Sequence, residues 1–402
     1  MKKLDNRGFS HDLLIVAFVL LFAIAGVAYL VASRAASPSF TLLGTHPQAS
    51  LQPTALGKTI YALQAWNGKI YAGYGDYGVN TGPIAITPFD PSSNTFASTP
   101  EVTQQTEAIG LYRVLNGKLV SASTDPSGGG STDYAIGTAG SPVAWQQVGP
   151  AYPAPNNGVN MTHNLDMNTL TGSDLWMVGS QGNDPVAYRS TDGGQTWVKM
   201  LDVVPPTGDY GRFYGAGVLN GKLYVQAMYV DNATNYIVGG ESSSHVFDGT
   251  SWAKGPSIST IMWHPESFAG KMVYSTWAAP DNDSATGLST FDGTKVAGAG
   301  VPEGIWGYTV DGTTLYALGT SGKIYSTTDL TNWYLQSTAP STARSIAVLN
   351  GVIYVGTTDS KLYSAPVNTS PTAVSGSGST TTTKGNKGGN GGGNGKPHIS
   401  KK

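Results

Sequence analysis

One pattern recurs along this chain: an apolar strand, a tight turn that contains glycine, and a second strand rich in Tyr and β-branched residues. Clear copies are ALQAWNGKIYAGYG (62–75), GAGVLNGKLYVQA (215–227) and IAVLNGVIYVG (346–356). Asn-Gly between two apolar runs predicts a β-hairpin, because both residues tolerate the positive φ of a type I′ turn. The seven turn glycines are Gly68, Gly117, Gly172, Gly221, Gly270, Gly312 and Gly351. The chain is therefore built from one repeated hairpin unit.

The spacing of these glycines, 39 to 55 residues, is typical of a four-stranded propeller blade. The composition agrees, since the chain has 53 Gly and 21 Tyr but only 12% charged residues, which suits strands and turns better than helices. The prediction is an all-β fold: a seven-bladed β-propeller of four-stranded antiparallel blades. The last unit is short, so the segment 40–51 is expected to supply its outer strand and close the ring.

A second motif lies in the later half of the third unit. Residues 190–197 read STDGGQTW, and this segment resembles the S-x-D-G-G-x-T-W Asp box of BNR repeats in sialidase-like propellers. Its matching residues are Ser190, Asp192, Gly193, Gly194, Thr196 and Trp197. The first unit, NGKIYAGYG followed by PFDPSSNTF, also resembles a kelch repeat. We expect a structural role for the Asp box: the Asp accepts backbone N–H bonds, the glycines permit the turn, and the Trp packs between blades.

The N-terminus predicts a membrane anchor. Residues 13–32 are 20 uncharged and mostly apolar residues, a length that spans about 30 Å of hydrocarbon as a helix. Basic residues at 2, 3 and 7 precede this run, which by the positive-inside rule places the propeller outside the cytoplasm. The expected location is a cell membrane crossed once. The alternative is a cleaved signal peptide and a secreted protein.

The expected organisation is a cytoplasmic N-terminus (1–12), a transmembrane helix (13–32), a linker (33–39), the propeller (40–367) and a disordered tail rich in Gly, Ser, Thr and Lys (368–402). Residues 40–367 carry 14 basic and 23 acidic groups. This acidic balance argues against nucleic acid as a partner. The chain has no Cys, so disulfides and thiolate metal sites are excluded. No cofactor or metal site is predicted.

In a propeller the first strand of each blade lines the central channel. The Asn-Gly turns and the Asp box share the lower face, so a ligand is expected at the opposite, upper mouth. The candidate ligand-binding residues there are Arg113, His163, Arg212, Trp263, His264, Glu266, Glu303, Trp306 and Arg344. Aromatic and polar groups together are typical of a sugar-binding surface. The alternative for the arginines is a structural role in ion pairs between blades or in hydrogen bonds that line the channel.

These observations leave three functional hypotheses. The leading one is a non-catalytic recognition or adhesion module that binds a glycan or a protein, with no catalytic residue assigned. The second is a sialidase-like glycoside hydrolase, which needs Arg113, Arg212 and Arg344 to converge beside a pair such as Tyr308 and Glu266. The third is a structural envelope protein with no pocket at the mouth. Whether the arginines converge decides between the first two.

Overall fold

The computed structural model describes residues 37–127, 134–148, 161–234, 237–259, 261–276 and 287–374. The predicted transmembrane segment 13–32 lies outside these residues, as does the tail after residue 374. Within the described ranges, no helix combines the length and the hydrophobicity needed to cross a bilayer. The one helical element there is a short 3₁₀ turn, η1 (Ala49–Leu51), so the all-β prediction is confirmed.

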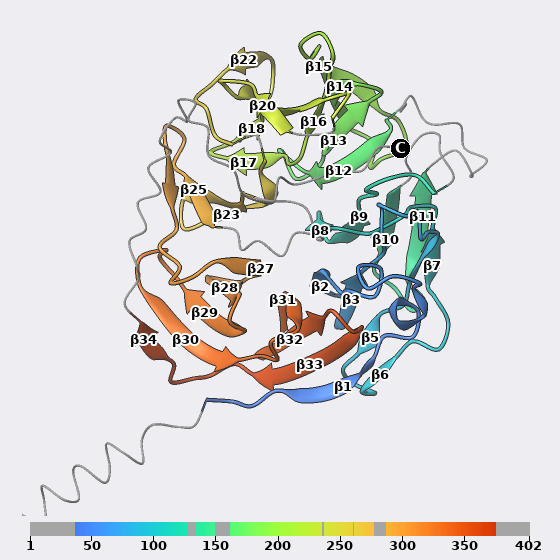
Figure 1. Ribbon diagram of the computed structural model, residues 1–402, viewed down its shortest axis with the longest axis vertical. Helices are drawn as coiled ribbons and strands as arrows, with labels where there is room; N and C mark the ends of the chain where they lie inside the picture. The colour runs from blue at the N-terminus through green and yellow to red at the C-terminus, as the bar shows by residue number, and fades with distance from the viewer. Residues whose placement is uncertain are drawn as a thin grey trace, which may run out of the picture.

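Seven antiparallel sheets of four or five strands surround a common axis (Figure 1). We number them one to seven by the chain order of their inner strands. The inner strands are β2 (Ala62–Trp66), β8 (Tyr112–Leu115), β12 (His163–Asn168), β17 (Gly217–Leu219), β23 (Trp263–Phe268), β27 (Ile305–Asp311) and β31 (Ala343–Leu349). The second strands are β3 (Lys69–Gly73), β9 (Lys118–Ser121), β13 (Leu175–Gln181), β18 (Lys222–Val225), β24 (Lys271–Ser275), β28 (Thr314–Gly319) and β32 (Val352–Thr357).

The two outer strands complete each sheet. The third strands are β5 (Phe89–Asp90), β10 (Tyr134–Thr138), β14 (Asp184–Ser190), β21 (His245–Phe247), β25 (Leu288–Phe291), β29 (Lys323–Thr327) and β33 (Lys361–Pro366). The fourth strands of sheets one to six are β6 (Thr95–Phe96), β11 (Ala144–Val148), β15 (Val198–Asp202), β22 (Trp252–Lys254), β26 (Val296–Gly298) and β30 (Trp333–Thr338). The seventh sheet takes its outermost strand, β1 (Thr41–Thr45), from the first of the described residues.

The hairpin turns have the predicted geometry. In the first turn, Asn67 has a φ of 49° and Gly68 a φ of 74°. The Asn-Gly turns at Asn116, Asn220 and Asn350 also have positive φ at both residues. These angles are accessible to Gly at little cost and to Asn more readily than to most residues. The sequence therefore fixes where each inner strand turns back into its second strand.

Closure of the ring occurs as predicted from residues 40–51. Strand β1 pairs with β33 in antiparallel register, with Thr41 opposite Ser364. On the inner side, Ser345 Oγ donates a hydrogen bond of 2.7 Å to the carbonyl oxygen of Ile60. A Cβ atom added at Gly356 would lie 2.4 Å from Cγ2 of Ile60, so only glycine allows this approach between the first and seventh sheets.

The propeller continues past its predicted end at residue 367. The backbone N–H of Asn368 donates to the side-chain oxygen of Gln336 at 3.0 Å. Strand β34 (Thr372–Val374) then pairs with β30 as the fifth strand of the sixth sheet. The predicted disorder from residue 368 onward is therefore wrong for residues 368–374, because β34 covers the edge that β30 would otherwise leave unpaired.

Apolar clusters fill the space between neighbouring sheets. One cluster joins Leu318 and Ile324 of the sixth sheet to Ile346 and Ile353 of the seventh. Each sheet thus buries its face against the next, which is why the repeat needs a closed ring.

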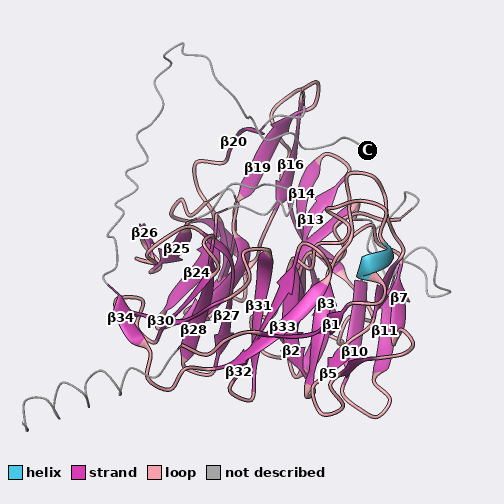
Figure 2. Ribbon diagram, turned by 60° about the horizontal axis from the view of Figure 1, so that its bottom comes forward, coloured by secondary structure: helices cyan, strands magenta, loops and turns pink. Residues whose placement is uncertain are grey.

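Two small sheets are added to the ring of seven larger sheets. Strands β4 (Ile84–Ile86) and β7 (Val102–Gln104) form a pair in the loops of the first sheet. Strands β16 (Asp209–Phe213), β19 (Ala227–Asp231) and β20 (Ile237–Gly240) form a three-stranded extension, which stands above the remaining strands in Figure 2. Because β16 leads directly into β17, this extension rises from the end of the fourth sheet where inner strands begin, which is the upper mouth.

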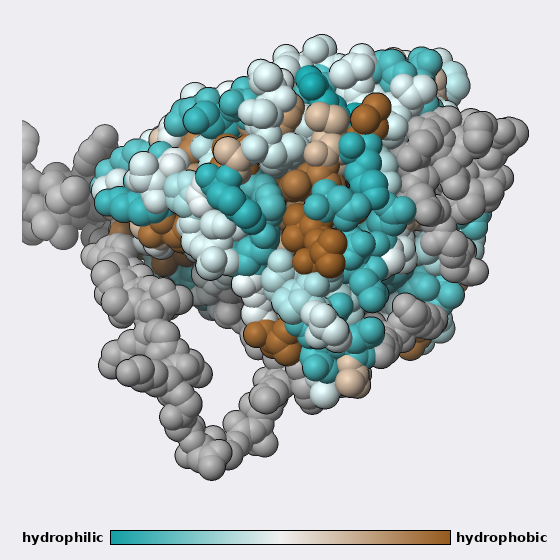
Figure 3. Space-filling view, turned by 90° about the horizontal axis from the view of Figure 1, so that it is seen from above, coloured by the Kyte–Doolittle hydropathy of each residue, from teal (hydrophilic) through white to brown (hydrophobic). Residues whose placement is uncertain are grey.

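Figure 3 looks onto the side that carries β14, β15 and β22, and it shows an apolar patch near the centre of this side. Hydrophilic and neutral side chains surround limited apolar patches there. Val198 and Val204, in and just after β15, are among the exposed apolar side chains of the chain. Scattered apolar groups of this kind are ordinary on a protein surface, and the charged groups of interest lie along the central channel instead.

Candidate functional site

A group of charged side chains in the channel is organised around Arg113 of β8. Its Nε and Nη2 atoms donate to Asp166 Oδ1 and Oδ2 of β12 at 2.6 and 3.0 Å, a bidentate pair between the second and third sheets. Its Nη1 atom donates to Glu266 Oε1 of β23 in the fifth sheet at 2.8 Å. Arg113 and Asp166 are buried, whereas the Glu266 side chain is 35% exposed. The structural alternative for Arg113, an ion pair between blades, is therefore confirmed.

His264 and Tyr308 complete this group, which we call the channel cluster (Arg113, Asp166, His264, Glu266 and Tyr308). His264 Nε2 lies 3.4 Å from Glu266 Oε1. The Tyr308 hydroxyl donates to the carbonyl oxygen of His264, and also to that of Val273 at 3.0 Å. His264 has a φ of 55°, a conformation that non-glycine residues adopt rarely. Tyr308 thus helps to hold the strained backbone that turns His264 toward Glu266.

The channel environment shifts the pKa values of these groups. Burial, with the nearby charge of Arg113, lowers the pKa of His264 to about 3, so its imidazole is neutral at physiological pH. Burial also raises the pKa of Glu266, and the Asp166 carboxylate adds to this rise while Arg113 opposes it. Burial raises the pKa of Tyr308 well above its usual value. The phenol is therefore a hydrogen-bond donor and not a ready nucleophile.

A second charged group lies higher, where β12 begins. His163 Nε2 is 2.7 Å from Asp125 Oδ1 and 3.0 Å from Arg212 Nη2, and its Nδ1 is 2.7 Å from Ser180 Oγ. Burial and the charge of Arg212 lower the pKa of His163. The Arg212 guanidinium also lies over the ring of Tyr210, 5.2 Å from its centroid. Asp125, His163 and Arg212 thus join the second sheet, the third sheet and the extension of the fourth.

A third group lies between the sixth and seventh sheets. The Arg344 guanidinium stacks on Trp306 at 4.2 Å from the ring centroid, and its Nη1 donates to the carbonyl oxygens of Ser341 and Ala343. Both side chains are partly exposed. This cation–π pair presents a flat aromatic and cationic surface near the start of β31.

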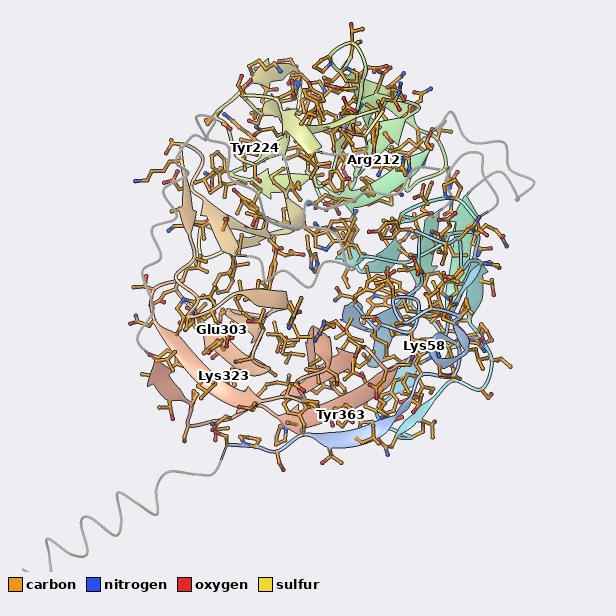
Figure 4. The ribbon with its side chains drawn as sticks, viewed as in Figure 1. Lys58, Arg212, Tyr224, Glu303, Lys323 and Tyr363 are labelled. Carbon is orange, nitrogen blue, oxygen red and sulfur yellow. The ribbon has the colours of Figure 1, made fainter. Side chains whose placement is uncertain are left out.

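Trp263 and Glu303 occupy separate positions. A Cβ atom built at Gly110, just before β8, would lie 3.3 Å from the Trp263 ring, so Trp263 reaches from the fifth sheet toward the second across the channel. Glu303 accepts hydrogen bonds from Ser321 and Tyr325 within its own sheet, at 2.7 and 2.8 Å. Those bonds lower the pKa of Glu303 against the opposing effect of burial. Glu303 thus anchors the sixth sheet, and Figure 4 shows it in a different sector from Arg212.

The three arginines contact different groups. Arg113 is paired with Asp166 and Glu266, Arg212 with His163, and Arg344 with Trp306 and backbone carbonyls. Tyr308 does lie beside Glu266 and Arg113, as a sialidase-like site requires, but its hydroxyl donates to main-chain carbonyls. No arginine triad for a substrate carboxylate is formed by these contacts.

The Asp box has the geometry of a structural turn. Asp192 Oδ1 accepts the backbone N–H groups of Gln195 and Thr196 at 3.0 and 2.9 Å, and Oδ2 accepts the Thr196 hydroxyl at 2.6 Å. These bonds, with that from Ser190, lower the pKa of Asp192 to about 2. Gly193 and Gly194 have φ values of 75° and 91°. Each of these residue types is therefore required by the turn itself.

Trp197, the last residue of the Asp box, packs in the interface between the third sheet and the second. Its Nε1 donates to the hydroxyl of Tyr134 in the second sheet at 2.7 Å, and the two rings meet edge to face at 5.6 Å. Trp333 is used similarly, since its Nε1 donates to the Ala299 carbonyl of the preceding sheet at 3.0 Å. The expected packing of the Asp-box Trp between neighbouring sheets is confirmed.

Sequence reasoning missed Asp166, on which the channel cluster depends. Its signal was an acidic residue inside the buried strand HNLDMN, where an unpaired carboxylate would be costly. Nothing in the sequence indicated which of the distant arginines would neutralise it. Among the described residues, no group of three His, Asp or Glu side chains is arranged to hold a metal ion.

The ring of radial four-stranded sheets, closed by β1 and carrying polar side chains along its axis, defines a β-propeller. No protein-family model matches the sequence, and no curated protein matches it. Virginiamycin B lyase from Staphylococcus aureus is similar in structure, with a TM-score of 0.48 and 11% identity over 82% of this chain and 99% of that one.

Two further solved propellers are similar to this chain. YCF48 bound to a D1 peptide has a TM-score of 0.45 and 12% identity, over 83% of this chain and 96% of that one. YCF48 from Cyanidioschyzon merolae has a TM-score of 0.43 and 10% identity, over 82% and 99%. At such identities the likeness concerns the fold alone, so the function has to be argued from the site.

Proposed function

We propose that this protein is a recognition or adhesion module: a seven-bladed propeller, related to the Asp-box and kelch-like propellers, that binds an extracellular glycan or protein at its upper mouth. The apolar segment 13–32 would anchor it in the membrane with the propeller outside the cytoplasm. The seven closed sheets and the Asp-centred turn at residues 190–197 support the architectural part of this proposal.

The observation that carries the functional part is the stacked pair of Arg344 and Trp306. Stacking on Trp306 and two hydrogen bonds to main-chain carbonyls orient the guanidinium near the start of β31, and both side chains remain partly exposed. Preorganised aromatic and cationic side chains are typical of binding hot spots. A second arginine–aromatic pair, Arg212 over the buried Tyr210, lies on the extension.

Binding of the full-length protein to a glycan array and to a panel of purified extracellular proteins tests this proposal. We expect a ligand whose binding is lost in Arg344→Ala and in Trp306→Ala. The matched control is Lys222→Ala, which removes an exposed cation beside the turn at the opposite end of the wheel. Absence of any ligand, or equal losses in Arg344→Ala and Lys222→Ala, would exclude the upper mouth as the recognition surface.

The rival proposal is a glycoside hydrolase, favoured only by the proximity of Glu266, Tyr308 and Arg113. Release of a fluorescent aglycone from sialosides or other glycosides, abolished by Glu266→Gln, would replace the recognition proposal. The third proposal, a structural envelope protein, predicts neither binding nor turnover.

A further inference from the structure

The channel cluster holds more negative than positive charge. Asp166 neutralises Arg113 through two hydrogen bonds, and Asp166 is further held by the backbone N–H groups of Met167 and Ala216 at 2.8 and 2.9 Å. Glu266 then brings a second carboxylate to the same guanidinium. With His264 neutral, the described members of the cluster sum to one uncompensated negative charge when Glu266 is ionised.

This excess charge is located on the part of the cluster that water reaches. The side chains of Arg113 and Asp166 are 4% and 0% exposed, whereas those of His264 and Glu266 are 20% and 35% exposed. Within the described residues, the polar contacts of Glu266 are those to Arg113 and His264, and both use Oε1. Its Oε2 atom therefore remains available for a donor that enters the channel.

The neighbouring groups suit a cation better than a neutral ligand. Glu266 Oε1 and His264 Nε2 are 3.4 Å apart, which is longer than a good hydrogen bond. The two side chains are nevertheless close enough that a single ligand nitrogen with several N–H groups could donate to both. Trp263 lies three positions before Glu266 and extends its ring across the channel to Gly110. A carboxylate and a neutral imidazole side by side offer the acceptors that an ammonium group needs, and an aromatic ring in the same channel adds a surface that suits a cation.

We propose that the channel cluster binds the primary ammonium group of a lysine side chain that a protein partner inserts through the upper mouth. This inference rests on the proposed recognition function for its partner, although the ammonium site itself can be tested without one. A lysine fits because its four-carbon stem is slender and can pack along apolar surface of the channel, while its ammonium group reaches the Glu266 carboxylate. The ammonium would be held by Glu266 and His264 and would cancel the excess charge.

Saturation-transfer NMR on the full-length protein, with Nα-acetyl-lysine amide as the probe, tests the site directly. The neutral control probe is Nα-acetyl-norleucine amide, which keeps the alkyl stem and lacks the ammonium. We expect transfer to the lysine ε-methylene protons at pH 8 and none to the norleucine analogue. Glu266→Gln should weaken the lysine probe about tenfold or more, because it removes a charge-assisted hydrogen bond.

The matched control variant is Asp202→Asn, which removes an exposed carboxylate that pairs with Lys199 on the rim. It should leave the affinity for the lysine probe unchanged. The Glu266→Gln protein should fold, since the raised pKa of Glu266 means that the folded protein favours an uncharged group there. A pH titration of the unmodified protein needs no variant at all. Binding should weaken as the pH falls through the raised pKa of Glu266, at a higher pH than the value of about 4.3 for an ordinary Glu.

Several results would overturn the ammonium site. They are equal transfer to the lysine and norleucine probes, equal affinity of Glu266→Gln and the unmodified protein, and a pH midpoint at the ordinary carboxylate value. Tighter binding of glucosamine than of the lysine probe would overturn the assignment to a protein lysine. Lysine binding that persists when neither a glycan nor an extracellular protein binds the propeller would refute the recognition function while leaving the ammonium site in place.

Discussion

Replacement of Arg113 by Met is the perturbation whose effect the structure defines most fully. Met keeps much of the apolar stem of Arg113 but removes the guanidinium that contacts both Asp166 and Glu266. Asp166, with a side chain that is 0% exposed, is then left with the backbone N–H groups of Met167 and Ala216 as its donors. Glu266 can still be hydrated, because it is 35% exposed. The cost therefore arises mainly from Asp166.

Removal of one partner from a buried ion pair costs about 3–5 kcal/mol. With a urea m-value of about 3 kcal/mol/M for a chain of this size, Arg113→Met should lower the urea midpoint by about 1–1.7 M. The double variant Arg113→Met/Asp166→Leu should recover part of the loss, about 1–2 kcal/mol, because it no longer buries an unpaired charge. The control Lys199→Met breaks an exposed pair, which should cost no more than about 1 kcal/mol.

The assay is urea unfolding of the full-length protein, followed by tryptophan fluorescence and by far-UV circular dichroism. Coincident curves from the two probes are required before midpoints are compared as free energies. A midpoint shift in Arg113→Met no larger than that in Lys199→Met would refute the buried pair. A double variant as unstable as the sum of the two single variants would show that the pair does not act as a unit.

Three further predictions follow from the interfaces and the turns. Trp197→Phe should lower the free energy of unfolding by about 1 kcal/mol through the lost hydrogen bond to Tyr134, and Trp197→Ala should lower it by about 3–5 kcal/mol. Urea unfolding measures both, and equal losses would show that packing of the Trp197 ring contributes nothing. Replacement of β1 (Thr41–Thr45) by a Gly-Ser segment should lower the urea midpoint more than the same change in β34 (Thr372–Val374), because β1 closes the ring while β34 is added to a sheet of four strands. Hydrogen bonds within their turns lower the pKa values of Asp192, Asp292 and Asp329 from 3.8 to about 2. The stability that these carboxylates contribute is therefore complete above the unfolded pKa and is lost as the pH falls from about 4 to about 2. A urea midpoint that stays constant over this pH range would contradict the role assigned to these turns.

The sequence by itself determined the repeated hairpins of this protein and the closure of its ring. The repeated Asn-Gly turns placed the hairpins, because few residue pairs tolerate positive φ at both positions. The short last repeat predicted that residues 40–51 return to the seventh sheet, since an open edge would otherwise remain. The role of Asp192 and Trp197 was also accessible, because the bonds of Asp192 are to residues within four positions of it.

Only the tertiary structure decided which channel residues meet. Arg113 contacts Asp166 and Glu266 across 53 and 153 positions of sequence, distances at which hairpin periodicity gives no pairing rule. A bulge between Trp263 and Glu266 and the positive φ of His264 re-aim the side chains at the start of β23, and neither has a local sequence signature. The sequence repeat therefore determines the ring of sheets through local backbone preferences. The direction of each channel side chain depends instead on how the sheets pack around the axis.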